Sequence, residues 1–264
     1  MLSNCRLCDA QDLALVMTDG RNRDLNYFRC GNCGLWNYDL DSGLNQEQYT
    51  EVYVSPTESD SKRNRNQRKS WAILKKRVPS PGRILDIGCG NGGLLYEARK
   101  DGWQVKGMEL SASAARAIEQ DTGIEVIVSD FLTYQPDESD VYDVVVLRHV
   151  LEHLPDPILA MERIGALLKP GGVTLMEFPN TRSVSYAWKR FLKNRGWKNK
   201  KFSADWRPGH CNEFCREAYD LLLQKTGFEL LEWRTYSNRP VEDMLLHVFP
   251  VGNKARVLAR KKPG

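Results

Sequence analysis

Apolar residues between 83 and 178 fall into short runs, and longer amphipathic stretches separate these runs. The run from Val141 to Leu147 is almost continuously apolar, as expected for a central parallel strand that is covered on both faces. Alternation of such strands with helical stretches predicts a doubly wound α/β sheet. The expected strands are 83–87, 104–108, 124–128, 141–147, 173–178, 228–233 and 244–249, and the expected helices are 94–99, 112–120, 157–168 and 217–225.

A glycine-rich turn follows the first of these strands. It reads Gly-Cys-Gly-Asn-Gly-Gly over residues 88–93, with Asp86 just before it. Glycine lets a ligand approach the backbone closely, and the spacing is neither that of a dinucleotide fold nor that of a P-loop. Glu109 ends the next strand, about twenty residues on, where such folds place the carboxylate that binds ribose hydroxyls. The pattern favours a nucleoside-type ligand over a plain strand–turn–helix unit without a ligand.

Length and composition limit the class of protein. A chain of 264 residues suits one large domain, or one domain with a small module, and 41% apolar residues are enough for a packed core. It has no apolar stretch of eighteen residues and no signal-peptide pattern at its start, so we expect a cytoplasmic protein without a transmembrane helix. The net charge of +4 is mild and does not by itself indicate nucleic-acid binding.

Two Cys-x-x-Cys pairs lie in the first 40 residues. Cys5 and Cys8 form one pair, and Cys30 and Cys33 form the other. Each pair makes a tight knuckle, and two knuckles complete a tetrahedron of sulfur around a zinc ion. A site with four sulfur ligands has no open position, so we expect it to be structural; the alternative is four unrelated cysteines. The segment resembles a zinc ribbon.

Basic residues are distributed unevenly in the rest of the chain. A connector, 41–80, contains an expected basic helix at 61–78, whose charged face is either simply solvated or binds a polyanion. In the segment 181–209, lysines and arginines alternate with tyrosines, tryptophans and phenylalanines. This mixture suits a nucleic acid, a nucleotide-linked sugar or an anionic membrane surface, or else the aromatics form the core of a pocket cover. The tail, 251–264, is basic and expected to be frayed.

Residues 80–235 resemble the class I S-adenosylmethionine (SAM) methyltransferases. The resemblance rests on Ile-Leu-Asp-Ile-Gly-Cys-Gly-Asn-Gly at 84–92, Gly-Met-Glu-Leu-Ser at 107–111, Ser-Asp-Phe at 129–131 and Leu-Lys-Pro-Gly-Gly at 168–172. It implies a Rossmann-like, mostly parallel sheet of seven strands over 81–250, preceded by the zinc module at 1–40. It implies cofactor contacts from Asp86, Gly88, Cys89, Gly90, Glu109, Leu110, Asp130, Phe131 and Arg148.

The resemblance implies that Asp86 binds the amino group of the methionine part of SAM and that Glu109 binds the ribose. Asp130 would meet the adenine amine, and Phe131 would lie against the ring.

Three histidines are candidates for the base that takes a proton from the methyl acceptor: His149, His153 and His210. His149 has the alternative role of supporting its loop. The segment 208–214 resembles a Pro-x-His-x-x-x-Phe signature of methyltransferases that include sugar and quinone-type enzymes. Sugar C-methyltransferases of this kind carry Glu where this chain has Gly209, and they have a further C-terminal domain.

These departures favour a hydroxyl acceptor on a small molecule, sugar or glycan. The alternatives are an RNA methyltransferase and a non-catalytic SAM-fold protein whose zinc ribbon binds a partner.

Overall fold

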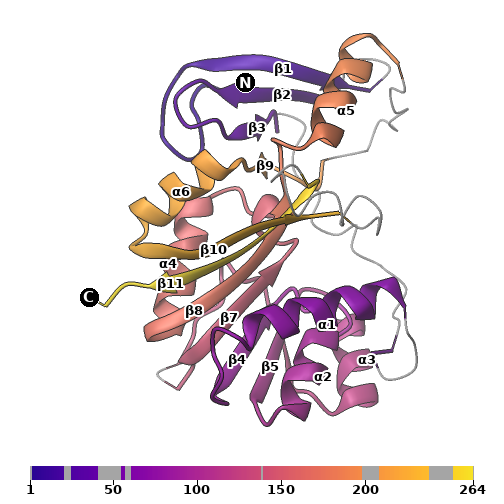
Figure 1. Cartoon of the computed structure of the whole chain (residues 1–264), viewed down its shortest axis with the longest axis vertical. Helices are drawn as coiled ribbons and strands as arrows, with labels where there is room; N and C mark the ends of the chain where they lie inside the picture. The colour runs from indigo at the N-terminus through magenta and orange to yellow at the C-terminus, as the bar shows by residue number, and fades with distance from the viewer. Residues whose placement is uncertain are drawn as a thin grey trace.

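The structure is a computed structural model of the chain. It describes residues 2–20, 25–40, 55–56, 61–137, 139–197, 208–237 and 252–263. These residues form two sheets, of four and seven strands, which stand one above the other in Figure 1.

The larger sheet confirms the predicted α/β class. Within the described residues its strand order is β10-β11-β8-β7-β4-β5-β6. Neighbouring strands from β8 to β6 are parallel, and β11 is antiparallel to both of its neighbours. The strands are β4 (Arg83–Ile87), β5 (Gln104–Glu109), β6 (Val126–Val128), β7 (Tyr142–Arg148), β8 (Leu168–Pro179), β10 (Phe228–Tyr236) and β11 (Lys254–Lys261).

The register of the central strands sets the position of the glycine turn. Asp86 on β4 lies beside Gly107 on β5 and beside Val146 on β7. The glycine turn after β4 and the residue that ends β5, Glu109, therefore lie at the same edge of the sheet. This carboxyl edge is where doubly wound sheets bind ligands.

Helices cover both faces of the sheet (Figure 1). Helices α1 (Lys62–Leu74), α2 (Gly93–Lys100) and α3 (Ala112–Thr122) lie on one face, and α4 (Pro157–Leu167) and α6 (Arg216–Lys225) lie on the other. The side chains of Ser61, Ser111 and Asp156 cap α1, α3 and α4 by accepting hydrogen bonds from backbone N–H groups.

The C-terminal segment corrects the prediction of a frayed tail. Residues Lys254–Lys261 form β11, which lies between β8 and β10, whereas the strand expected at 244–249 falls outside the described residues. A basic segment fits there because its apolar residues, such as Val257 and Ala259, are fully buried. Its cations are also neutralised: the buried Arg256 pairs with Glu177 on β8.

The N-terminal module is joined to the rest of the molecule through a shared sheet. Its strands β1 (Leu13–Asp19), β2 (Leu25–Cys30) and β3 (Trp36–Tyr38) are completed by β9 (Asn212–Glu213) from the other half of the chain. Helix α5 (Val184–Asn194), from the basic-aromatic segment, lies against β1, where Lys193 and Asp19 form a buried ion pair of 2.6 Å.

Candidate active site

A cavity of about 590 Å³ opens at the carboxyl ends of β4, β5 and β7. All nine residues expected to contact a cofactor line it. The wall also contains polar residues from α1 and the histidines of the segment after β7. The lining includes Asp86, Gly88, Cys89, Gly90, Glu109, Leu110, Asp130, Phe131, Arg148, Arg63, Gln67, Asn91, His149 and His153.

The glycine turn forms the floor of the cavity. Gly88 and Gly90 have φ of +66° and +63°, in the left-handed region that side chains disfavour. A Cβ atom at Gly88 would lie 2.5 Å from Val150 Cγ2, so the backbone packs tightly there. A Cβ at Gly90 would meet no atom within 4 Å, so the bare backbone of Gly90 faces open space.

Asp86 presents an unsatisfied carboxylate oxygen. The residue is 1% exposed, and its Oδ1 atom is buried without a hydrogen-bond partner among the described residues. Burial raises the pKa of Asp86 to about 7, and the charges of Glu109 and Glu177 add to this effect while Arg148 opposes it. A buried acceptor without a donor fits a ligand that brings a cationic donor, such as the amino group of SAM.

Glu109 and its neighbours shape the next part of the wall. The Gly90 N–H donates to Glu109 Oε2 at 3.2 Å, and the Leu110 N–H donates to Oε1 at 2.9 Å. These bonds hold the carboxylate at the end of β5, where it can accept from vicinal hydroxyls. The Leu110 side chain is 52% exposed, and Phe131 from the segment after β6 also lines the cavity, so an apolar surface is available for a ring.

Helix α1 supplies polar groups that the sequence analysis did not single out. Gln67 Nε2 donates to Asn91 Oδ1 at 2.7 Å, and Asn91 Nδ2 donates to Asn64 Oδ1 at 2.9 Å. Asn64, Gln67, Trp71 and Leu74 recur at helical spacing and are all buried. This spacing was the signal in the sequence that could have identified Asn64 and Gln67, because polar residues on the apolar face of a helix indicate a buried polar contact.

Glu177 on β8 is a second buried carboxylate that sequence analysis missed. It is 1% exposed and accepts from Ser70 at 2.6 Å, Arg256 Nε at 2.6 Å, Tyr236 at 2.9 Å and Arg148 Nε at 3.2 Å. Although burial opposes its ionisation, the two guanidinium groups hold its pKa well below the usual range. The ion pair fixes Arg148 at the end of β7 beside Asp86. The signal in the sequence was Glu177 itself, a single acidic residue within an otherwise apolar strand.

His149 is held at both ring nitrogens. It has φ of +59°, its Nδ1 lies 3.2 Å from Glu152 Oε1, and its Nε2 lies 3.0 Å from Lys254 Nζ. A lysine donating to Nε2 occupies the lone pair that a base would use. The geometry therefore favours the supporting role for His149.

His153 and His210 lie together on the other side of this segment, at the short helix η1 (Leu151–His153). Their rings meet edge to face with centroids 4.4 Å apart. His153 Nδ1 lies 2.7 Å from the Gly209 carbonyl oxygen, so Nδ1 carries the donated proton. Burial lowers the pKa of His153, and the charge of His210 lowers it further while Glu152 opposes this. His153 is therefore neutral at pH 7.

His210 is in contact with His153 rather than on the cavity wall. Its Nδ1 lies 3.0 Å from Glu213 Oε1. Burial disfavours its charged form, but Glu213 and Glu152 outweigh this and raise the pKa of His210. The pKa values of the two histidines are thus shifted in opposite directions, and His153, whose neutral form is favoured, is the one that lines the cavity.

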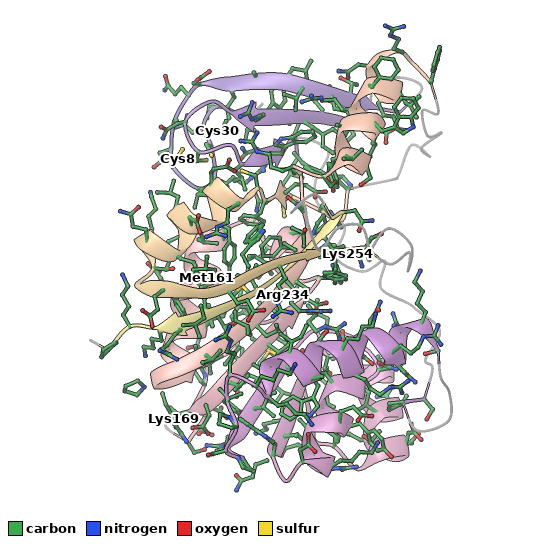
Figure 2. The ribbon with its side chains drawn as sticks, in the orientation of Figure 1. Cys8, Cys30, Met161, Lys169, Arg234 and Lys254 are labelled. Atoms are coloured by element: carbon green, nitrogen blue, oxygen red, sulfur yellow. The ribbon has the colours of Figure 1, made fainter. Side chains whose placement is uncertain are left out.

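Four sulfur atoms gather at the end of the N-terminal module. Cys5, Cys8, Cys30 and Cys33 place their Sγ atoms within 4.8 Å of one another, and Figure 2 shows Cys8 and Cys30 beside each other. The hydrogen bond from Cys33 lowers the pKa of Cys5 to about 5, so a thiolate is available. Four sulfur donors at this spacing fit tetrahedral zinc.

A second group of potential ligands lies near the cavity. Ligand atoms of Glu152, His153 and His210 also lie within 4.8 Å of one another, and Glu152 Oε2 is buried without a hydrogen-bond partner in the described part of the chain.

Comparison with known proteins identifies relatives of the larger domain. The family model described as a methyltransferase domain matches residues 61–232. Ubiquinone biosynthesis O-methyltransferase of Vibrio vulnificus (strain YJ016) is 33% identical over 109 residues, which are 39% of this chain and 46% of that protein. The enzyme of the same name from Aliivibrio fischeri (strain MJ11) is 31% identical over 109 residues, 39% of this chain and 47% of that protein. The matches span about half the length of these relatives.

Solved structures share the fold. Magnesium protoporphyrin IX methyltransferase from Synechocystis PCC 6803, with bound SAH, superposes with a TM-score of 0.57 over 76% of this chain and 84% of that one, at 14% identity. A SAM-dependent methyltransferase from Archaeoglobus fulgidus gives a TM-score of 0.53 over 74% and 94%, at 20% identity. Among the described residues, no helix has the length and apolar character to cross a membrane.

Proposed function

Because this chain belongs to the family of class I SAM-dependent methyltransferases, we propose that it methylates a hydroxyl group on a small molecule. The observation that supports this most directly is the placement of a neutral histidine, His153, on the wall of the same cavity that carries Asp86 and Glu109. A cofactor site and a base thus open into one space.

The cofactor half of the cavity suits SAM, which supplies an electrophilic methyl group when bound. Asp86 offers its unpartnered oxygen to the amino group of the methionine part. The bare backbone at Gly90 allows close approach, and Glu109 accepts from the ribose hydroxyls. Leu110 and Phe131 would provide apolar contacts for the adenine ring, and Asp130 would accept from its amine.

The acceptor half of the cavity is proposed to work by general base catalysis. With Nδ1–H donating to Gly209, the imidazole of His153 keeps its lone pair on Nε2, which takes the proton of the acceptor hydroxyl as the oxygen–methyl bond forms. A positioned base of this kind contributes about 10²–10⁴-fold in rate. Burial favours the neutral form of His153 most strongly, and His210, which is held by Glu213, lowers the pKa of His153 further.

A hydroxyl acceptor also agrees with the names of the relatives, which are O-methyltransferases acting in ubiquinone biosynthesis. We propose zinc as a second, structural component, bound by the four thiolates of the N-terminal module. No carboxylate or imidazole belongs to that sulfur group, so it offers a closed structural site.

Helix α5 and the residues after it carry exposed aromatic rings that are relevant to the identity of the acceptor. Trp188 and Phe191 stack with centroids 5.4 Å apart, and both are exposed, as is Trp197. Exposed rings beside Arg190 and Arg195 also suit a nucleic acid, a glycan or an anionic membrane surface. The glycan and nucleic-acid alternatives are therefore included in the test.

The test is transfer of radiolabelled methyl groups from SAM into fractionated extract, comparing small-molecule, glycan and RNA pools. We expect label in the small-molecule pool and a loss of about 10²-fold or more in His153→Ala, with unchanged SAM affinity. Asn194→Ala is the control and should keep full activity, because Asn194 is an exposed residue of α5 that lies outside the cavity lining.

Label chiefly in RNA, with binding that weakens steeply with salt, would replace the small-molecule proposal by an RNA methyltransferase. Full activity of His153→Ala would exclude this residue as the base.

A further inference from the structure

The segment that carries His210 is anchored to the N-terminal module. Strand β9, at Asn212–Glu213, pairs with β3, so Trp36 lies opposite Glu213 and Asn37 lies opposite Asn212. The Tyr38 N–H donates to the Cys211 carbonyl oxygen at 3.0 Å. The chain from 209 to 213 is therefore an edge strand of the cysteine-bearing sheet as well as a wall behind the acceptor site.

Arg6 reinforces this anchor from within the first cysteine knuckle. Its Nη1 donates to the Cys211 carbonyl oxygen at 2.9 Å, and its Nη2 donates to the Tyr38 carbonyl oxygen at 2.7 Å. One guanidinium therefore joins β3 to the 209–213 segment. Because Arg6 lies between Cys5 and Cys8 in the sequence, the shape of the knuckle sets where its side chain points.

Asn37 ties β3 to the same knuckle. Its Oδ1 accepts from the Arg6 backbone N–H at 3.0 Å, and its Nδ2 lies 3.7 Å from Cys5 Sγ. Asn37 is fully buried, so these bonds are shielded from water. A contact path thus runs from the cysteines through Asn37 and Arg6 to Cys211.

The far end of this path fixes both histidines. The Gly209 carbonyl accepts from His153 Nδ1, and the Cys211 N–H donates to the Glu152 carbonyl oxygen at 2.9 Å. The Tyr38 hydroxyl donates to Glu213 Oε1 at 2.5 Å, and Glu213 in turn holds His210. Moving the segment would release the carbonyl that decides which nitrogen of His153 carries the proton.

We propose that the N-terminal cysteine module is a positioning element of the acceptor site, and that it acts through Arg6 by holding the 209–213 segment against His153. The proposal rests on the proposed role of His153 as the base. Under this proposal the N-terminal cysteine module contributes to catalysis although it does not contact the cofactor.

The charges around the two rings come from several elements. His153 is faced by Glu152 on its own helix, and by His210 and Glu213 from the 209–213 segment. His210 is faced by Glu213, Glu152 and, from α5, Lys189. Release of the segment would take the Gly209 carbonyl away from Nδ1, so the proton of the neutral His153 ring would no longer be held on that nitrogen.

The experiment compares Arg6→Met with Arg29→Met in the full-length, zinc-loaded protein. Each arginine adjoins a cysteine, Cys5 or Cys30, but among the described residues no hydrogen bond or ion pair joins the Arg29 side chain to the 209–213 segment. Imidazole ¹⁵N shifts are followed across pH, and each histidine is assigned by its own His→Gln variant. Zinc content and SAM affinity are measured alongside.

We expect the parent to show one His153 tautomer, with Nδ1 protonated. Arg6→Met should give a mixture of His153 tautomers while zinc and SAM binding stay within about two-fold of the parent. Removal of zinc from the parent with a chelator should have the same effect, and Arg29→Met should have none. If Arg6→Met does not fold, Tyr38→Phe, which loosens the same segment at Glu213, should give the mixture of His153 tautomers instead.

An unchanged His153 in Arg6→Met and after zinc removal would overturn the inference, as would an equal change in Arg29→Met. The readout needs no turnover. A failure to find a methylated product would therefore count against the proposed function, while the tautomer measurement alone decides the positioning role.

Discussion

Asp86→Asn should weaken cofactor binding and at the same time stabilise the ligand-free protein. The carboxyl group is buried and its pKa is raised to about 7 from an ordinary 3.8. The folded state therefore binds this proton more tightly than the unfolded chain, and the contribution of Asp86 to stability falls as pH rises from about 4 to about 7. The difference of about three units between the two pKa values corresponds to about 4 kcal/mol of free energy of unfolding. Asparagine never ionises, so this is the upper limit of the stability that Asp86→Asn gains at pH 8.

The effect on SAM has the opposite sign. A hydrogen bond between Asp86 and the cofactor's ammonium group is worth about 1.5–3 kcal/mol, so the variant should bind SAM about 10- to 150-fold more weakly at pH 8. Because the cation binds the ionised carboxylate, the parent should release about half a proton on binding at pH 7, and its affinity should rise between pH 6 and pH 8. The variant should release none, and its affinity should be flat over that range.

Calorimetric titration in two buffers of different ionisation enthalpy measures both affinity and proton release, and thermal unfolding at pH 8 measures stability. Asp140→Asn is the matched control, because Asp140 is buried, accepts from Tyr142 at 3.0 Å and lies outside the cavity lining. It should lose stability and keep SAM affinity. Equal SAM affinity in Asp86→Asn, or a drop in its stability at pH 8, would refute the reasoning.

Three further changes test other parts of the site. Glu109→Ala should weaken SAM binding by about 1–3 kcal/mol, because the ribose hydroxyls lose a charged acceptor; unchanged titration curves would remove Glu109 from that role. Elemental analysis should find one zinc ion per chain in the parent and none in Cys30→Ser, which should melt at a lower temperature while SAM still binds; a zinc-free parent would contradict the metal assignment. Arg256→Met should destabilise the protein by about 2–4 kcal/mol, because Glu177 stays buried with one guanidinium partner fewer. Denaturant unfolding measures this change, and an unchanged free energy of unfolding would argue against the buried network.

The sequence determined the class of fold and the cofactor half of the site. Apolar runs identify β4 and β7 because a strand buried on both faces must be apolar along its length. The glycine turn and the acid that ends β5 identify the ligand edge, because close backbone approach and ribose binding each require a particular residue type. These signals are local, so they can be read without knowing what packs against what.

Tertiary structure alone decided the last strand and the acceptor half of the site. Residues 254–261 looked like a basic tail, and they became β11 because Glu177, about eighty residues earlier, neutralises Arg256 inside the sheet. In the same way, no local pattern tells which of three histidines can act as a base. Lys254 contacts His149 Nε2, the Gly209 carbonyl contacts His153 Nδ1, and Glu213 contacts His210 Nδ1. A pKa depends on neighbours brought together by folding, and the neighbours of His153 include His210 and Glu213 from a distant part of the chain.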